Sequence, residues 1–380
     1  MNARSRRLGR AAAFLAGTAL LAGCASAASH TSPAPTAAAA PLATSMTVTG
    51  AGTWAIVVMG GSSADENNFW ELFTRPAGGT QWELATPPGV ADNGGLIASG
   101  GDGSLTVVFR PSQGLTFSPL ASTSDDGKTW GTGLLDAAVA PVPDALAAGS
   151  GHTLALLDDG TIEQSGAAGV NWTRLATPDA IATSPAGRQC QVTGLTAVAY
   201  TPSGSPLAAA SCGRPGTVGI FARTAAGAWQ AAGPAARGDS PVRVLRLTGT
   251  TAGDTALLTS GTGSAASLFA AWTADGARWT TSSALPTGSG QVLASGTGPG
   301  TTAWVLLTGG RAAIITGPGA AWRQLPTPPK GTATLAAVSG ATVDALAVNG
   351  ASLTVYQLTT GGTWTKTQSA KVPIQYGSSS

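Results

Sequence analysis

Seven tryptophans recur along the chain at intervals of 42 to 57 residues, and this repeat limits the folds that the chain can adopt. They are Trp82, Trp130, Trp172, Trp229, Trp279, Trp322 and Trp364. Six of them have a glycine three residues earlier, and Trp229 has Gly227 two residues earlier. A glycine just before an aromatic residue that starts a strand marks a tight turn needing positive φ. Such a turn at a regular interval indicates a chain built from repeated β units.

Four short strands can be placed in each repeat. In the second repeat they are expected at 96–99, 104–110, 115–123 and 129–135. In the seventh repeat they are expected at 335–339, 342–348, 352–360 and 363–369. Each segment is apolar or β-branched and is bounded by Gly, Pro, Ser or Asp, as strands are. Units of four strands repeated around a ring are the pattern of a β-propeller.

The sequence therefore predicts an all-β fold, a seven-bladed β-propeller of four-stranded antiparallel blades, over residues 45–376. No helical period of useful length follows residue 24. The long interval between Trp172 and Trp229 leaves room for an insertion. Residues 371–376 are left over after the last strand and are expected to clasp the ring.

One copy of the repeated turn is complete. The segment Thr123-Ser124-Asp125-Asp126-Gly127-Lys128-Thr129-Trp130 follows the pattern Ser/Thr-x-Asp-x-Gly-x-Thr-Trp, and residues 273–279 form a shorter copy. The pattern resembles the Asp-box, or BNR repeat, of sialidases and of sialidase-like and sortilin-type propellers. In that family the turn joins the third and fourth strands of a blade, on the face opposite the active site. The resemblance implies a structural role for Thr123, Asp125, Gly127, Thr129 and Trp130, with the carboxylate closing the turn and the indole packing between sheets.

The activity that this resemblance suggests is sialidase-like glycoside hydrolysis. That chemistry needs three arginines, a Tyr nucleophile paired with a Glu, and an Asp acid/base. The nearest matches to the family's Arg-Ile-Pro motif, Arg75-Pro76 and Arg110-Pro111, lack the Ile. Tyr200 and Tyr356 fall within expected strands, where packing is the expected role. We therefore expect no catalytic residues, and a glycoside hydrolase with a degenerate motif set remains the alternative.

Metal chemistry has little support either. Metal sites commonly use histidine, and the chain has only His30, before the first expected strand, and His152, in an expected turn. The glycine pairs, such as Gly60-Gly61, are not followed by a helix that could bind phosphate. We therefore expect no metal and no cofactor.

Charged residues do gather in one set of expected loops. The loops joining the second and third strands of the blades meet at one mouth of a propeller's channel. They carry Asp65, Glu66, Arg110, Asp158, Asp159, Arg214 and Arg311. Only 10% of the residues are charged, so this grouping is a candidate mouth for an acidic or sugar ligand, with ordinary polar loop tips as the alternative.

The N-terminus has the features of an export signal. Four arginines and no acid occur in the first ten residues, and the apolar run over 11–23 is shorter than the roughly 20 residues of a membrane-spanning helix. The run ends Leu21-Ala22-Gly23-Cys24, which resembles the bacterial lipobox. The resemblance implies that the Cys24 thiol carries a diacylglycerol, with cleavage after residue 23. Ser5-Arg6-Arg7-Leu8 resembles part of a twin-arginine motif, so the export route stays open.

The mature chain is expected to work outside the cytoplasm, anchored to the cell membrane through Cys24. Residues 24–44, rich in Ala, Ser, Thr and Pro, are expected to form a flexible tether. Loss of four arginines leaves a net charge of −2, so nucleic acid is not an expected partner. Cys190 and Cys212 then form an even pair that favours a disulfide within blade four, with two buried thiols as the alternative. The expected partner is a protein or a carbohydrate.

Overall fold

The computed structural model describes residues 43–371 except for nine short segments and four single positions. The gaps are 61–68, 86–94, 101–102, 110–115, 167–168, 236–239, 340–341, 350–351 and 359–361, and positions 150, 170, 251 and 299. The chain divides into two units, 1–38 and 39–380, and only the second has described residues. Cys24, Asp65, Glu66, Arg110 and residues 372–376 therefore lie outside the described residues.

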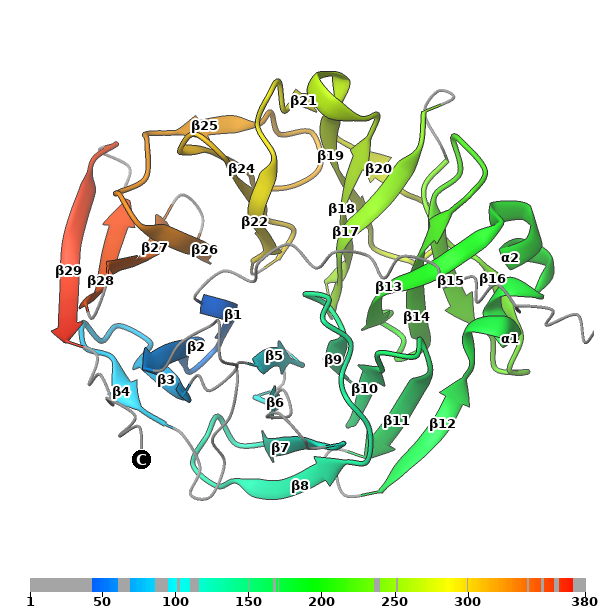
Figure 1. The fold of residues 1–380 in the computed structure, drawn as a ribbon, viewed down its shortest axis with the longest axis horizontal. Coiled ribbons are helices and arrows are strands. Elements are labelled where there is room, and N and C mark those ends of the chain that lie inside the picture. Colours follow the sequence, from blue (N-terminus) through cyan, green and yellow to red (C-terminus); the bar gives the residue numbers. More distant parts are fainter. Residues whose placement is uncertain are drawn as a thin grey trace, which may run out of the picture. The chain divides into compact units, whose positions relative to one another are not determined.

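Seven antiparallel sheets, each built from consecutive strands, are arranged around a common centre (Figure 1). The seven-bladed β-propeller that the tryptophan repeat predicts is confirmed. Blades one and two are β1 (Ala43–Thr49), β2 (Gly52–Gly60), β3 (Phe69–Pro76) and β4 (Glu83–Leu84), then β5 (Gly95–Ser99), β6 (Leu105–Phe109), β7 (Ser118–Thr123) and β8 (Gly131–Leu135). Blades three and four are β9 (Leu146–Gly149), β10 (His152–Leu156), β11 (Ile162–Gly166) and β12 (Trp172–Ala176), then β13 (Val192–Tyr200), β14 (Pro206–Cys212), β15 (Gly219–Arg223) and β16 (Trp229–Ala231).

The other three blades repeat this order. Blade five has β17 (Val242–Thr250), β18 (Gly253–Ser260), β19 (Ser267–Thr273) and β20 (Thr280–Thr281), and β21 (Leu285–Pro286) also pairs with β19. A 3₁₀ turn, η1 (Gly263–Ala265), precedes β19. Blades six and seven are β22 (Val292–Thr297), β23 (Ala303–Leu307), β24 (Arg311–Ile315) and β25 (Arg323–Leu325), then β26 (Thr332–Ser339), β27 (Thr342–Asn349), β28 (Ser352–Leu358) and β29 (Trp364–Lys371).

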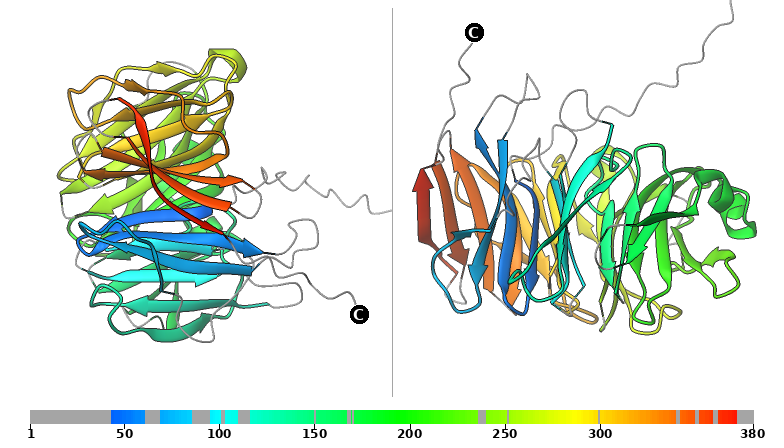
Figure 2. Two further views of the ribbon diagram at one scale, coloured as in Figure 1. Left: turned by 90° about the vertical axis from the view of Figure 1, so that its left-hand side faces the viewer. Right: turned by 90° about the horizontal axis from the view of Figure 1, so that it is seen from below.

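The first strand of each blade faces the channel. Each of these innermost strands contacts the innermost strand of the next blade, and β26 contacts β1, so the ring is closed. Side views show the strands running between the two faces of the ring (Figure 2). Among the described strands, each blade consists of strands that are consecutive in the chain, so no blade combines strands from the two ends of the chain.

The hydrophobic core lies between the blades, and β2 shows why. Along β2, Trp54 and Ile56 pack against blade two, whereas Ala55 and Val57 pack against blade seven. Side chains alternate between the two faces of a strand, and both faces of this strand are buried. Such strands are recognised by a continuous apolar run rather than by alternation.

Three of the seven repeat tryptophans connect their blade to the one before it. In three blades the indole N–H donates to a carbonyl one or two residues after the outer strand of the preceding blade. These bonds, called the indole latches below, run from Trp279 to Ala232, from Trp322 to Ser283 and from Trp364 to Pro326, at 2.5, 3.2 and 3.1 Å. The latches explain why a large aromatic residue with a donor recurs at this position.

A buried ion pair joins the last blade to the first. Arg75 of β3 pairs with Asp344 of β27, and Gln357 donates to the same carboxylate at 3.1 Å. Burial raises the pKa of Asp344, and the Arg75 charge only partly opposes this. The guanidinium lies 5.7 Å from the Trp82 ring centre, and the Trp82 backbone N–H donates to Gln368 Oε1 at 2.7 Å. Arg75, from one of the partial Arg-Pro matches, therefore helps to close the ring.

Two short helices, α1 (Pro178–Ala182) and α2 (Pro185–Cys190), occupy the long interval between the third and fourth repeat tryptophans. These segments of five and six residues are too short to show a helical period, so the periodicity of the sequence does not reveal them. Their sequence signal is local, since Thr177 and Ser184 cap them and proline follows each cap. None of the helices within the described ranges has the length and apolar character needed to span a bilayer.

The predicted disulfide is confirmed between Cys190 and Cys212. Cys190 ends α2, in the connection that precedes blade four, and Cys212 ends β14 within that blade. The bond thus attaches the helical insertion to the second strand of blade four, instead of lying wholly within the blade.

Candidate functional site

The channel of the ring contains a cavity of about 470 Å³. All seven innermost strands contribute to its wall, which reaches the turns at Gly50, Ala252 and Gly300. Its volume lies within the range of about 300–1,000 Å³ that small-molecule sites occupy. Among the described hollows, this channel cavity is lined by the largest number of blades.

The cavity reaches one particular face of the ring. Gly50, Ala252 and Gly300 lie in turns that join the first and second strands of their blades. In an antiparallel blade these turns are at the same end as the turns joining the third and fourth strands. One of the latter is the 124–130 turn, so this end is called the Asp-turn face below.

One ion pair stands in the channel wall. Arg246 Nε lies 3.1 Å from Asp144 Oδ1, and the Leu247 backbone N–H donates to Asp144 Oδ2 at 2.6 Å. Burial raises the pKa of Asp144, although the Arg246 charge partly opposes this. The pairing of β17 with β18 shifts register between Val244 and Arg246, and such a bulge re-aims the side chains that follow it. The pair connects blade five to the segment before blade three.

Hydroxyl groups make up much of the remaining polar wall. Thr47 and Ser99 share a hydrogen bond of 2.9 Å between blades one and two. Thr248 and Thr297 share one of 2.7 Å between blades five and six. Each hydroxyl has one proton and two lone pairs, so each pair keeps one proton that a ligand can receive.

Two further titratable groups lie at or beside the cavity. Tyr200 lines it, and its hydroxyl accepts from Gln164 Nε2 at 2.9 Å. Burial raises the pKa of this phenol. Asp254 is 1% exposed and pairs with Gly249 across β17 and β18. Neither of its carboxylate oxygens has a hydrogen-bond partner among the described residues, and burial raises its pKa to about 7.

The predicted charged mouth is only partly described. Asp158 and Asp159 occupy the turn between β10 and β11, Arg214 follows β14, and Arg311 begins β24. These are connections between second and third strands, at the end opposite the Asp-turn face. None of the four lines the channel cavity, and their grouping into one ligand site stays a prediction.

Two of these side chains have local structural contacts. The Asp159 carboxylate accepts from the backbone N–H of Thr161 at 2.7 Å and from its hydroxyl at 3.0 Å. Arg311 donates to the Thr287 carbonyl. Asp144 and Arg246, by contrast, were missed by sequence reasoning. The sequence offers one indication of them, because each is a charged residue next to or within an otherwise mostly apolar innermost strand.

The 124–130 turn joins β7 to β8 and is closed by its own side chains. Asp125 Oδ1 accepts from the Thr123 hydroxyl at 2.7 Å and from the Thr129 N–H at 2.9 Å, and Oδ2 accepts from the Thr129 hydroxyl at 2.7 Å. The hydrogen bonds from Thr129, followed by that from Thr123, lower the pKa of Asp125 to about 2. Gly127 has a φ of +81°, which suits glycine.

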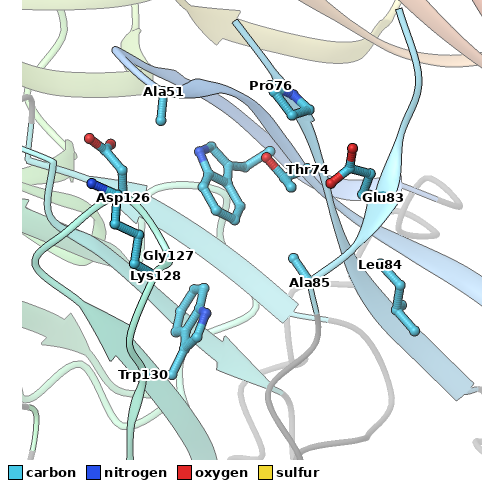
Figure 3. Close-up of a pocket in the computed structure, with 11 residues that line it drawn as sticks. Ala51, Thr74, Pro76, Glu83, Leu84, Ala85, Asp126, Gly127, Lys128 and Trp130 are labelled. Carbon is cyan, nitrogen blue, oxygen red and sulfur yellow. The ribbon is translucent and has the colours of Figure 1, made fainter. Parts of the chain in front are cut away.

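A second hollow of about 480 Å³ lies on the Asp-turn face, between blades one and two (Figure 3). Trp54 and Trp130 line it, with ring centres 6.1 Å apart and nearly perpendicular planes. Glu83, Asp126 and Lys128 supply its charged groups. This hollow is called the blade one–two groove below. Within the described ranges, no group of three or more Asp, Glu, His or Cys residues is arranged to hold a metal ion.

Comparison with known proteins supports the fold but no particular activity. No protein-family model and no curated protein matches the chain. A GH74 xyloglucanase from Xanthomonas campestris has a TM-score of 0.55 and 14% identity over 83% of this chain and 52% of its own. This chain thus spans about half the length of that enzyme. The periplasmic gluconolactonase PpgL of Pseudomonas aeruginosa has a TM-score of 0.54 and 14% identity over 83% and 96%. At such identities the likeness shows the propeller fold alone, and the fold does not decide whether this protein is an enzyme.

Proposed function

We propose that this protein is a non-catalytic binding module, anchored at the outer face of the cell membrane by a lipid on Cys24, with its ligand seat in the channel cavity. The observation that carries this proposal is the wall of the cavity. It combines a charged pair, Asp144 with Arg246, and hydroxyl groups from several blades. A concave site with a few convergent polar groups is the usual form of a small-molecule site.

The contacts of the polar groups favour binding over catalysis. Catalysis by a general base or a nucleophile needs a free reactive group within hydrogen-bond reach of its partner. Asp144 is engaged by Arg246 and by the Leu247 N–H, and the Tyr200 hydroxyl is engaged by Gln164. These contacts hold the wall in place and leave neither group poised to attack a substrate. Asp254 has no hydrogen-bond partner among the described residues, but it is fully buried and does not line the cavity.

Arg246 is the group best placed to recognise a ligand. Its Nε lies 3.1 Å from Asp144 Oδ1 as an ion pair, and none of its three guanidinium nitrogens has a hydrogen-bond partner among the described residues. A guanidinium donates in a rigid fork, so these nitrogens suit a carbonyl, hydroxyl or carboxylate oxygen. The Asp144 charge offsets that of Arg246, which favours a polar ligand of low net charge.

The test is a thermal-shift screen of the full chain with neutral sugars, sugar acids and amino acids. Arg246→Lys keeps the charge opposite Asp144 but loses the fork, and Arg243→Lys is the matched control because Arg243 lies exposed on the same strand. We expect a compound that raises the melting temperature of the parent and of the control but not of Arg246→Lys. A ligand that stabilises all three equally places the site elsewhere.

An activity assay addresses the alternative function. The same purified chain is incubated with a sialoside and with other glycosides, and the release of sugar is followed. We expect no turnover. Turnover that survives purification to homogeneity overturns the non-catalytic assignment and supports a glycoside hydrolase.

A further inference from the structure

The blade one–two groove lies beside Trp130, one of the four repeat tryptophans for which no indole latch is found among the described residues. Trp130 holds the position of the latch tryptophans in blade two, and Ala85 is the first residue after the outer strand of blade one. Both line the groove, yet no hydrogen bond joins them. The Trp130 ring packs instead on Trp54, and its N–H has no partner among the described residues. Figure 3 shows the indole nitrogen on the side of the ring that faces Ala85.

A second unsatisfied polar group lies in the same groove. Asp126 lines it, and its Oδ1 is buried without a hydrogen-bond partner among the described residues. The backbone of Asp126 has a φ of +59°, in the left-handed region that aspartate and asparagine adopt more often than other non-glycine residues. Buried polar groups are normally hydrogen-bonded, so an unsatisfied one calls for a partner that the described chain does not supply.

A hollow between blades five and six gives a comparison, although its turn comes from the earlier of its two blades. It measures about 260 Å³ and is lined by Asp275 and Arg278 of the shorter copy of the turn. The indole N–H of Trp272, which lines it, donates to the Thr301 carbonyl at 2.6 Å. The Asp275 carboxylate is satisfied by its own turn, through the backbone N–H groups of Ala277 and Arg278. Asp275 corresponds to Asp125, which its own turn satisfies in the same way. Of these two hollows, only the blade one–two groove is lined by an indole N–H and a buried carboxylate oxygen that both lack a hydrogen-bond partner among the described residues.

We propose that the blade one–two groove binds a neutral saccharide, a ligand and a site separate from those of the channel cavity. Its donors are the Trp130 indole and the Lys128 ammonium, and its acceptors are the carboxylates of Glu83 and Asp126. Sugar hydroxyls donate and accept, so one neutral sugar satisfies both kinds of group. The charges of Glu83, Asp126 and Lys128 sum to −1, which disfavours an anionic ligand, and the Lys128 ammonium opposes a cationic one. The exposed Leu84 and the indole edge supply apolar surface for the C–H faces of a sugar ring.

The indole N–H of Trp130 provides a direct readout. The full chain, labelled with ¹⁵N at its 11 tryptophans and kept in a detergent without a sugar head group, gives one indole signal for each. Trp130→Phe assigns the signal from the groove. Cellobiose, maltose and trehalose are the neutral probes, and glucosamine and glucuronic acid are the charged ones. We expect at least one neutral probe to shift the Trp130 signal while the latched Trp279 signal stays in place.

Side-chain changes locate the contacts. Asp126→Asn keeps a residue that tolerates positive φ, and Lys128→Met keeps the length of the side chain, and each should weaken binding at least fivefold. Glu83→Gln gives the same test outside the turn, where folding of the turn is not at risk. Arg278→Met, at the corresponding turn of blade five, is the matched control and should leave the affinity unchanged.

Three results would overturn the proposal. The first is a Trp130 signal that no neutral probe moves up to its solubility limit. The second is tighter binding of glucosamine or glucuronic acid than of every neutral probe, which would refute the ligand class. The third is slow exchange of the Trp130 indole proton with water in the free protein, because this would show that the chain itself covers the groove.

Discussion

Replacing Asp344 by Asn should severely destabilise the closed ring. Asp344 is fully buried and Arg75 is 6% exposed, so the change leaves a guanidinium with no counter-charge at the junction of blades seven and one. Arginine does not lose its proton in proteins, so the charge cannot be relieved. Removing one partner of a buried pair costs about 3–5 kcal/mol. That is a large share of the roughly 5–15 kcal/mol by which a domain is stable.

Removing the arginine of the pair should lower the free energy of unfolding by less than removing the aspartate. Arg75→Met leaves Asp344 without its cation, but a carboxyl can take up a proton and become neutral. Burial already raises the pKa of Asp344 in the intact pair, which makes this escape easier. In the double variant no buried charge remains, so it should be more stable than the sum of the two single changes predicts. The coupling should be about 1–3 kcal/mol, the range measured for residues in contact.

Urea unfolding of the full chain, followed by tryptophan fluorescence and circular dichroism, measures these free energies. Asp158→Asn is the matched control, because Asp158 is exposed in a turn and its loss should change stability by less than about 0.5 kcal/mol. An Asp344→Asn variant within 1 kcal/mol of the parent, or additive single changes, would show that the pair does not hold the ring closed.

Three further predictions follow from single residues. Burial raises the pKa of Asp254 from 3.8 to about 7, so the folded state binds this proton more tightly than the unfolded state, and stability falls as the pH rises between those values. Asp254→Asn should therefore stabilise the fold at pH 8, by up to about 4 kcal/mol, and less at pH 5. Denaturant titration at both pH values measures this difference. Gly127→Ala should lower the free energy of unfolding by about 2–4 kcal/mol, because an added Cβ would lie 2.4 Å from the Trp54 ring and the backbone has a positive φ. Gly78→Ala, which also has a positive φ but lies in open space, should lower it by about 1–2 kcal/mol. Cys24→Ser should abolish fatty-acid labelling of the chain, and a labelled variant would refute the lipid anchor.

The architecture could be predicted because its determinants are repeated and local. The Gly-x-x-Trp turn recurs, and each copy specifies where an outer strand begins. Trp279 shows the second half of the reason, since its indole also bonds to the preceding blade at Ala232. One residue thus encodes both a strand boundary and a contact between blades, and counting such residues gives the number of blades.

The channel site could not be predicted in this way. Asp144 reaches Arg246 across an interval of about one hundred residues, and it does so only because a bulge in β17 re-aims the arginine. Neither the closure of the ring nor the bulge leaves a periodic trace in the sequence. Asp344 is similar, because nothing near it in the chain indicates that its partner is Arg75 in the first blade.

The placement of charge separates structural from functional residues in this protein. Only 10% of the chain is charged, and the two ion pairs among the described residues both join elements that are far apart in the sequence. Arg75 is buried against Asp344, so its guanidinium is not accessible to a ligand. Arg246 differs, because it lines the channel cavity. The channel cavity and the blade one–two groove both reach the Asp-turn face, whereas Arg214 and Arg311 lie at the opposite end. Ligand binding that depends on Arg246 or Trp130 but not on Arg214 and Arg311 would therefore assign recognition to the Asp-turn face, and the reverse dependence would assign it to the predicted charged mouth.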